Sequence, residues 1–443
     1  MNAHVANVLY WWAQGLRGEP VADVLRELEA GARMPVERVR ALQSERVRRL
    51  LQHAYRNVPF YRESWSKAGF AQGDWDRPEA LALLPVLEKR EVQEQGERLR
   101  AQGDRDALVA KTSGSSGTPV SVLRSHTSWA HAHANQIRAW RWHGIEVGER
   151  HAYFWGLAFD AAGRRQARLK DWFFNRDRCS AFTLDGARAA DFYARLRRQP
   201  TTYALGYPSA IAQFASELRA RGLDGRALGW RAIVTTAEVL HPHQRTLLRD
   251  TFGAAVVNLY GCAEAGVLAM ECEQGALHVP IESVALQWMD GANHGSPREV
   301  LVTDLHNYAQ PLIRYRAGDL VETATEECGC GRPLPSIGAV TGRAGDTLIL
   351  PGGRRVNANL PSYVFKHHAE AGTVQEYQFV QFGDGRVELR IKPGPGFGDA
   401  TAREIRTEVA HVLGLEVDLR LLDRFERSAR GKHRDFVRAD DPS

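Results

Sequence analysis

The N-terminal part of the chain carries apolar positions at helical spacing. They recur mostly every three or four residues, at Val36, Val39, Leu42, Val47, Leu50, Leu51 and Ala54. This period places apolar side chains on one face of a helix. Asn57-Val58-Pro59 interrupts the pattern, because proline has no N–H for a helix interior. We therefore predict that residues 1–70 are helical, with a break at Pro59.

Shorter apolar runs predict strands in the middle of the chain. Leu108-Val109-Ala110 and Val120-Ser121-Val122-Leu123 flank a Gly/Ser/Thr loop, which predicts a strand, a turn and a strand over 106–126. Further along, helical stretches alternate with short apolar runs at 203–205, 232–235 and 256–259. Alternation of this kind favours a largely parallel sheet covered by helices.

The pattern changes again after residue 282. Apolar runs at 284–288, 299–302 and 312–315 predict strands of an antiparallel, β-rich subdomain near 282–340. A small-residue break follows at Thr341-Gly342-Arg343-Ala344-Gly345-Asp346. Beyond this break the pattern predicts a strand pair near 376–392, a helix at 401–413 and a strand at 416–422.

These elements together predict an α/β protein with two domains. The large, multilayered N-terminal domain spans 1–342 and combines the helical start, parallel sheets with helices and the β-rich subdomain. A small, mobile α+β C-terminal domain spans 343–443. The length of 443 residues agrees with this division, because single cores stop growing at roughly 250–300 residues.

Composition and charge narrow the class of protein. Hydrophobic residues are 44% and charged residues 25%, as in ordinary globular proteins. No apolar run has the roughly 18 residues that a membrane span needs. The N-terminus has no basic start and no small-residue cleavage site, so we expect a cytoplasmic protein. The net charge of +5 is spread without a basic block, which argues against nucleic acid and is compatible with polyanions such as ATP or coenzyme A.

One glycine- and hydroxyl-rich loop is the sharpest local motif. It reads Thr112, Ser113, Gly114, Ser115, Ser116, Gly117, Thr118 and Pro119. Successive backbone N–H groups and hydroxyls in such a loop can surround a polyphosphate. No Gly-Lys-Ser/Thr follows, so the loop is not a Walker A motif. Taken alone, it is also typical of a plain hairpin turn.

With the motifs that follow it, this loop resembles the acyl-adenylate-forming superfamily, which includes acyl-CoA synthetases and adenylation domains of peptide synthetases. In Tyr260-Gly261-Cys262-Ala263-Glu264, the resemblance implies an aromatic residue near the adenine and a glutamate that helps to hold Mg²⁺ on ATP. Thr236-Ala237-Glu238 resembles a family segment beside the adenine, with Glu238 as its acidic residue; a plain strand end is the alternative.

Three later residues complete the family order. The resemblance implies that Asp319 binds the ribose hydroxyls and that Arg343 contacts the nucleotide at the hinge between the domains. Gly345 stands where the family usually has Asp or Lys, so one family side chain is missing. The resemblance places Lys432 at the carboxylate and the α-phosphate during adenylation. It also implies that the C-terminal domain rotates between two half-reactions.

The segment 46–61 resembles the opening of phenylacetate–CoA ligases and of relatives encoded with capsule genes. The predicted function is ATP-dependent activation of a carboxylic acid, aryl or aryl-like, to acyl-AMP, followed by transfer to coenzyme A. A carrier-protein thiol or an amine is the alternative acceptor. A nucleotide-binding scaffold without catalysis is a third hypothesis, against which Lys432 and Glu264 argue. A homodimer is left open.

Aromatic side chains lie where the family places its acid pocket. The candidates are Tyr153, Trp155, Tyr207 and Ser209. Aromatic walls would suit an aryl acid. The alternative is that these aromatic residues belong to the core.

A separate group of residues predicts a metal site. Cys272, His278, Cys328 and Cys330 offer three thiolates and one imidazole, a complete tetrahedral set for Zn²⁺. Because no position stays open, we predict a structural and not a catalytic zinc. Reduced, partly buried thiols are the alternative. Cys179 and Cys262 have no partner that the sequence identifies.

Overall fold

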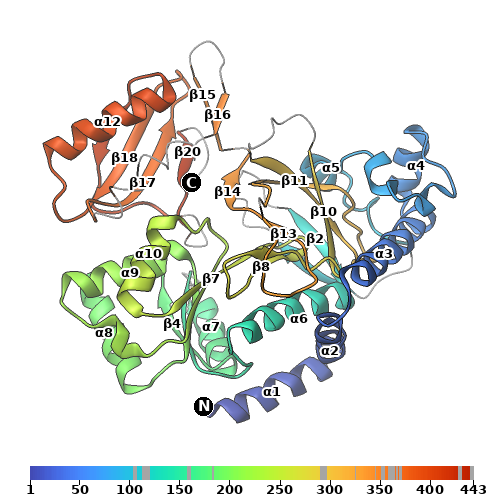
Figure 1. Ribbon diagram of the computed structural model, residues 1–443, viewed down its shortest axis with the longest axis horizontal. Coiled ribbons are helices and arrows are strands. Elements are labelled where there is room, and N and C mark those ends of the chain that lie inside the picture. The colour runs from blue at the N-terminus through green and yellow to red at the C-terminus, as the bar shows by residue number, and fades with distance from the viewer. Residues whose placement is uncertain are drawn as a thin grey trace. The chain divides into compact units, whose positions relative to one another are not determined.

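A computed structural model gives the architecture of the chain (Figure 1). It describes residues 1–102, 107–111, 120–156, 161–181, 184–289, 297–324, 326–344, 346–350, 355–357, 365, 368, 372–427 and 432–439. The chain divides into two compact units. One comprises Glu149–Val257 and Gly342–Ser443 together with Met1, and the other comprises Asn2–Gly148 and Asn258–Thr341.

The second of these units begins with the predicted helices. They are α1 (Ala3–Leu16), α2 (Val21–Gly31), α3 (Val36–Asn57) and α4 (Pro59–Lys67), followed by the short η1 (Asp74–Asp76), η2 (Ala80–Leu83) and α5 (Lys89–Glu94). The predicted break is confirmed, since α3 ends at Asn57 and Pro59 is the first residue of α4. Leu50, Leu51 and Ala54 are buried, as the helical spacing predicted.

Strands of three sheets and a long helix complete this unit. The predicted strand-turn-strand is an antiparallel pair of β1 (Ala107–Lys111) and β2 (Ser121–Ser125), and α6 (His126–Trp142) follows it. One larger sheet contains β7 (Ala255–Cys262), β8 (Gly266–Glu271), β9 (Leu277–His278) and β13 (Ser336–Ile337). The other has the order β10 (Val284–Trp288), β11 (Arg298–Asp304), β12 (Tyr315–Val321) and β14 (Val340–Arg343). The β10–β11 and β11–β12 pairs are antiparallel, as predicted for the β-rich part.

The predicted strand at 312–315 was wrong in its extent. β12 begins only at Tyr315, because Arg314 has φ 54 and a left-handed residue cannot continue a regular strand. The Arg314 side chain donates to the carbonyl of Leu81 at 2.6 Å, and its N–H donates to the Thr303 hydroxyl at 3.0 Å. These two hydrogen bonds hold the bend that orients β12.

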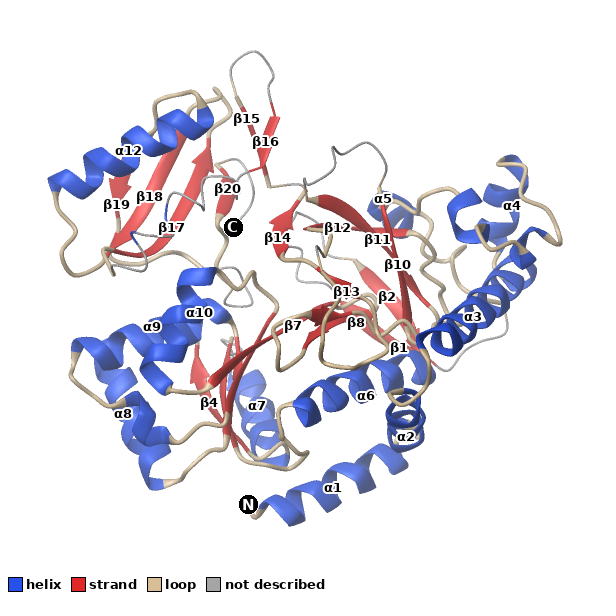
Figure 2. Ribbon diagram, viewed as in Figure 1, coloured by secondary structure: helices blue, strands red, loops and turns tan. Residues whose placement is uncertain are grey.

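The other unit starts with a parallel α/β layer. Its elements are β3 (His151–Trp155), α7 (Ala161–Phe173), β4 (Arg176–Ser180), α8 (Gly186–Arg198), β5 (Tyr203–Gly206), α9 (Pro208–Ala220), η3 (Gly225–Leu228), β6 (Ala232–Thr236) and α10 (Pro242–Phe252). The strands lie in the order β4-β3-β5-β6 and all pair in parallel, as the alternating pattern predicted. Figure 2 shows α8, α9 and α10 grouped beside these strands, and Phe192, Phe214 and Phe252 fill the core between them.

The same unit ends with an α+β layer. It contains the pair β15 (Thr347–Ile349) and β16 (Arg355–Asn357), then β17 (Val374–Gln381), β18 (Val387–Pro393), α12 (Asp399–Leu413), β19 (Asp418–Leu421) and β20 (Phe436–Arg438). The four-stranded sheet has the order β19-β18-β17-β20. Figure 1 shows α12 lying over one face of this sheet, where Ile405, Val409 and Leu413 are fully buried. Within the described ranges, no helix has the length and apolar character needed to cross a membrane.

Candidate active site

The hairpin of β7 and β8 presents two of the predicted site residues. The register shifts between Tyr260 and Gly261, so the strand bulges just before the turn that carries Glu264. A Cβ on Gly261 would lie 2.4 Å from the carbonyl oxygen of Gly266, so only glycine fits this close approach. The sequence Tyr-Gly-x-x-Glu therefore has a local structural reason: the glycine lets the hairpin close and sets the place of Glu264.

Two tyrosine hydroxyls join this hairpin to strand β12. The Tyr260 hydroxyl donates to Asp319 Oδ2 at 2.8 Å, and the Tyr315 hydroxyl donates to Glu264 Oε1 at 3.1 Å. Tyr315 and Asp319 are four residues apart on β12, and both are buried. The structure thus brings together Tyr260, Glu264 and Asp319, which the sequence places as far as 59 residues apart. We call these three residues and Tyr315 the carboxylate cluster.

A buried arginine lies near the carboxylate cluster. Arg124 forms an ion pair with Asp304 at 3.6 Å, and both side chains are 3% exposed. Burial lowers the pKa of Arg124, whereas Asp304, Cys262 and Glu264 act in the opposite direction. Burial raises the pKa of the Cys262 thiol well above its ordinary value, and Glu264 and Asp319 raise it further. Cys262 therefore stays a thiol and is a poor nucleophile.

In the other unit, Glu238 engages the backbone on two sides. It follows β6 by two residues, after Ala237, whose φ is 71. One carboxylate oxygen accepts the N–H of Ser209 at 3.2 Å, and the other accepts the N–H of His433 at 2.7 Å. Glu238 thus links the start of α9 to the residue that follows Lys432.

The predicted pocket residues form an aromatic group in the same unit. The rings of Tyr153 and Trp155 stack with 5.4 Å between their centroids, and the ring centroids of Trp155 and Tyr207 are 4.2 Å apart. The guanidinium of Arg176 covers the Tyr153 ring at 4.1 Å. Tyr207 is completely buried, and Ser209 is buried with its hydroxyl accepting a hydrogen bond from Arg427 at 3.0 Å. The structure brings the three aromatic candidates together, and Tyr207 also belongs to the core.

The structure describes some of the remaining predicted site residues and not others. Lys432 is half-buried and immediately precedes the anchored His433. Arg343 is the last residue of β14, and its carbonyl accepts the N–H of Asp346 at 3.1 Å. The predicted phosphate loop, Thr112 to Thr118, and Gly345 lie outside the described residues.

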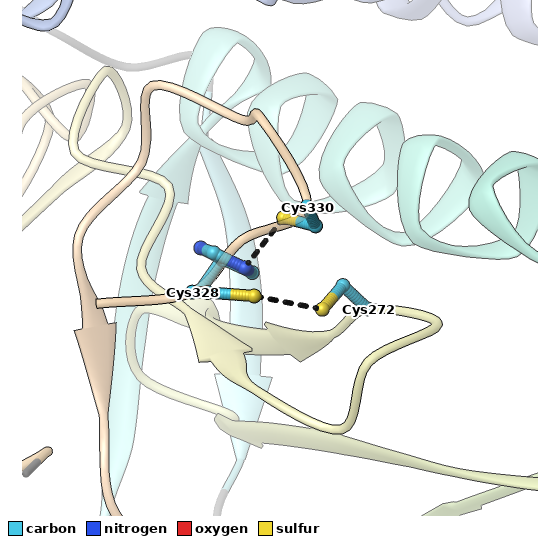
Figure 3. A group of neighbouring side chains, drawn as sticks. Cys272, Cys328 and Cys330 are labelled. Carbon is cyan, nitrogen blue, oxygen red and sulfur yellow. Dashed lines mark hydrogen bonds between the residues drawn. The ribbon is translucent and has the colours of Figure 1, made fainter. Parts of the chain in front are cut away.

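The four predicted metal ligands converge (Figure 3). Their ligand atoms all lie within 4.8 Å of one another. Cys272 Sγ is 3.6 Å from Cys328 Sγ, and Cys330 Sγ is 3.2 Å from His278 Nε2. A separation of 3.6 Å excludes a disulfide, whose sulfur atoms lie about 2.05 Å apart. Two ligands that each lie about 2.0–2.3 Å from one zinc ion are about 3.3–3.8 Å apart in a tetrahedron. The Cys272–Cys328 distance falls within this range, and the Cys330–His278 distance lies just below it.

The surroundings of these ligands also fit a metal. His278 Nδ1 faces the carbonyl of Leu334 at 2.7 Å, which directs Nε2 toward the thiols. Arg332 forms a two-armed ion pair with Glu273, with both distances at 2.7 Å, and its guanidinium covers the Trp142 ring at 4.2 Å. These contacts hold the loop that carries Cys328 and Cys330 against α6.

Several residues of these sites were not singled out from the sequence. They are Tyr315, Arg124, Arg427 and His433. Tyr315 and Arg427 lie close in sequence to the predicted Asp319 and Lys432, which was a usable signal. The others carry no local signal, because each acts through a contact with a residue far away in the chain.

The chain has clear relatives in sequence. It is 28% identical over 334 residues to the phenylacetate–coenzyme A ligase of Pseudomonas putida, covering 72% of this chain and 73% of that protein. It is 24% identical over 440 residues to the phenylacetate–coenzyme A ligase of Aromatoleum evansii, covering 93% of this chain and 97% of that protein. A shorter match, 24% identical over 241 residues, joins it to the indoleacetate–lysine synthetase of Pseudomonas savastanoi and covers 53% and 58%. No protein-family model matches the chain.

A solved structure shares the fold. The crystal structure of 2-hydroxyisobutyryl-CoA ligase in the postadenylation state, in complex with 2-HIB-AMP, has a TM-score of 0.74 at 20% identity and covers 92% of this chain and 91% of that one. The predicted α/β fold class is confirmed. These similarities support the predicted resemblance to the acyl-adenylate-forming superfamily. Within that superfamily, the sequence relatives support the phenylacetate–CoA ligase-like branch that the motifs predicted.

Proposed function

We propose that this protein is an ATP-dependent acid–thiol ligase that forms AMP. In the first half-reaction, a carboxylate oxygen of the acid attacks the α-phosphate of ATP, and pyrophosphate leaves. In the second, the thiol sulfur of coenzyme A attacks the acyl carbonyl of the acyl-AMP, the thiol proton is released and AMP leaves. The observation that carries the proposal is the carboxylate cluster, because it joins Tyr260, Glu264 and Asp319, the residues that the family resemblance assigns to the nucleotide site.

Each cluster residue then has a role. Asp319 accepts hydrogen bonds from the ribose hydroxyls, and the Tyr260 hydroxyl holds its carboxylate in place. Glu264 is half-buried and offers the oxygen ligands that Mg²⁺ prefers. The ion would neutralise charge on the leaving pyrophosphate. Tyr315 orients Glu264.

The remaining roles follow the motif order. The loop from Thr112 to Thr118 surrounds the phosphates, and Arg343 contacts the nucleotide. Lys432 offers a point charge to two anions that repel each other, the acid carboxylate and the α-phosphate. The large domain over 1–342 carries the nucleotide site, and the small domain over 343–443 supplies Lys432. Rotation of the small domain separates the two half-reactions.

The acid is aryl or aryl-like. The aromatic group of Tyr153, Trp155 and Tyr207 offers flat apolar faces, which suit an aromatic ring. Coenzyme A is the acceptor, as in the ligase relatives. An amine is the second candidate acceptor, because a lysine synthetase is among the relatives. A carrier protein, a homodimer and a cytoplasmic location stay predictions.

Cys272, His278, Cys328 and Cys330 hold one structural Zn²⁺. The ligand distances and the fixed direction of His278 Nε2 support this assignment. Four protein ligands complete a tetrahedron, so the ion takes no part in the reaction. The metal fastens the loop after Glu327 to the end of β8.

Pyrophosphate release tests the function. The full chain is incubated with ATP, Mg²⁺ and a panel of aryl and alkyl acids, with and without coenzyme A. We expect release that depends on an aryl acid, and a thioester only when coenzyme A is present. Acyl transfer to lysine in place of coenzyme A would identify the second candidate. Release that never depends on any acid would contradict the proposal.

A further inference from the structure

A ring of polar contacts surrounds the segment that carries Lys432. It joins two parts of the same compact unit, the α/β layer and the α+β layer. Its members are Ser209 and Glu238 from the first layer, and Glu376, Arg427 and His433 from the second. We call it the Lys432 ring.

The contacts follow one another in a closed order. Glu238 accepts the N–H groups of Ser209 and His433, at 3.2 and 2.7 Å. The hydroxyl of Ser209 accepts from Arg427 Nη1 at 3.0 Å, and Arg427 Nη2 pairs with Glu376 at 2.7 Å. Glu376 Oε2 faces His433 Nδ1 at 3.8 Å, which closes the ring.

The ring is built from buried charges. The side chains of Arg427 and Glu376 are only 8% and 10% exposed, so neither can turn to bulk water when the other is removed. Burial alone would raise the pKa of Glu376, but Arg427 and then His433 bring it below its ordinary value. Such pairs tolerate little displacement, because losing one partner leaves a charge buried alone. The ring therefore resists small shifts.

His433 is fixed from two further sides. Its Nε2 donates to the carbonyl of Tyr377 on β17 at 2.8 Å, and Asp435 Oδ1 lies 3.4 Å from the same nitrogen. Asp435 Oδ2 in turn contacts His241 Nε2, just before α10, at 3.1 Å. The backbone and the imidazole of His433, the residue next to Lys432, are thus both held in place.

The ring also reaches the candidate acid pocket. Ser209 lies two residues after Tyr207, whose ring contacts Trp155. Through its N–H and its hydroxyl, Ser209 contacts both Glu238 and Arg427. The resemblance placed Glu238 beside the adenine, yet both its oxygens are engaged by backbone N–H groups that lead to the pocket and to Lys432.

We infer that Ser209, Glu238, Arg427 and Glu376 are positioning residues that hold Lys432 for acyl-AMP formation and tie its place to the wall of the acid pocket. The inference rests on the proposed function. The ring has to open when the C-terminal domain leaves for the second half-reaction. Its loss should therefore slow the first half-reaction and spare the second.

The test uses full-length variants Arg427→Met and Glu376→Gln, with Arg420→Met on the exposed strand β19 as a matched control. Single-turnover pyrophosphate release measures the first half-reaction, and thioester formation from supplied acyl-AMP and coenzyme A measures the second. Since a displacement of about 1 Å can cost about 10²-fold, we expect release to fall roughly 10- to 100-fold at saturating ATP. Thioester formation and the KM for ATP should stay within about twofold. Arg427→Lys should restore part of the rate.

Equal loss of both half-reactions, or no loss in either, would overturn the inference. If Arg427→Met does not fold, Glu376→Gln removes the charge that pairs with Arg427, and Ser209→Ala removes the hydroxyl that Arg427 contacts, each with little change in volume. Hydrogen exchange over 432–439 is the second readout, and it should rise in the ring variants but not in Arg420→Met. If the wild type releases no pyrophosphate with any acid, the proposed function fails. If hydrogen exchange over 432–439 is then also unchanged in the ring variants, the positioning role of the ring is overturned as well.

Discussion

Tyr315→Phe isolates one hydrogen bond of the carboxylate cluster. The Tyr315 side chain is 2% exposed, so phenylalanine can fill the same space and removes only the hydroxyl. That hydroxyl donates to Glu264 Oε1 at 3.1 Å. The substitution leaves Glu264 in place but frees its carboxylate to turn.

The size of the effect follows from the geometry. A hydrogen bond to a charged group contributes about 1.5–3 kcal/mol. Here the distance is slightly beyond the usual O–H···O range, and Glu264 is half-buried, so water can replace part of the contact. We therefore take the low end, about 1.5 kcal/mol, which corresponds to roughly a tenfold lower rate of pyrophosphate release.

The matched control is Tyr260→Phe. Its hydroxyl donates to Asp319, which we assign to the ribose, at 2.8 Å. Tyr260→Phe should therefore raise the KM for ATP, whereas Tyr315→Phe should lower the maximal rate and shift its dependence on Mg²⁺. Initial rates with varied ATP and varied Mg²⁺ separate the two. A Tyr315→Phe enzyme with wild-type rate and wild-type Mg²⁺ dependence would refute the role given to Glu264.

Three further predictions concern other parts of the molecule. Lys432→Ala should abolish acid-dependent pyrophosphate release and leave acyl transfer from supplied acyl-AMP largely intact; equal loss of both would contradict the assignment. Cys328→Ser should lower the zinc content from near one equivalent per chain, measured by mass spectrometry of the metal, and lower the melting temperature; a metal-free wild type would disprove the site. Burial would raise the pKa of Asp435, but His241 and His433 lower it to about 2. The protein should therefore lose about 2 kcal/mol of its free energy of unfolding as the pH falls from about 4 to 2. Asp435→Asn should flatten that part of the acid-unfolding curve.

Much of this protein could be predicted from the sequence. Apolar spacing located the helices around Leu50, the parallel strands and the C-terminal strand pair, because these elements bury one face each and the pattern of that face is local. The Tyr260–Glu264 motif was also readable, since Gly261 is required by the closure of its own hairpin. The four metal ligands could be proposed because cysteine and histidine have few other uses in such a pattern.

Other features depended on the tertiary structure. The sequence pattern extended a strand to Leu312, but the turn at Arg314 is held by Thr303 and Leu81, which local propensity does not include. The family resemblance assigns Glu238 to the nucleotide, and only the fold shows that its carboxylate spans from Ser209 to His433.

The difference between the features that the sequence predicted and those that depended on the tertiary structure has a physical reason. Helices, strands and tight hairpins are determined by residues within a few positions of one another, so their pattern survives in the linear order. Buried ion pairs such as Arg427 with Glu376, and hydroxyl contacts such as Tyr260 with Asp319, join residues 51 and 59 positions apart. A buried charge is tolerated only where the fold supplies its partner, so the partner can be named only after the chain has folded.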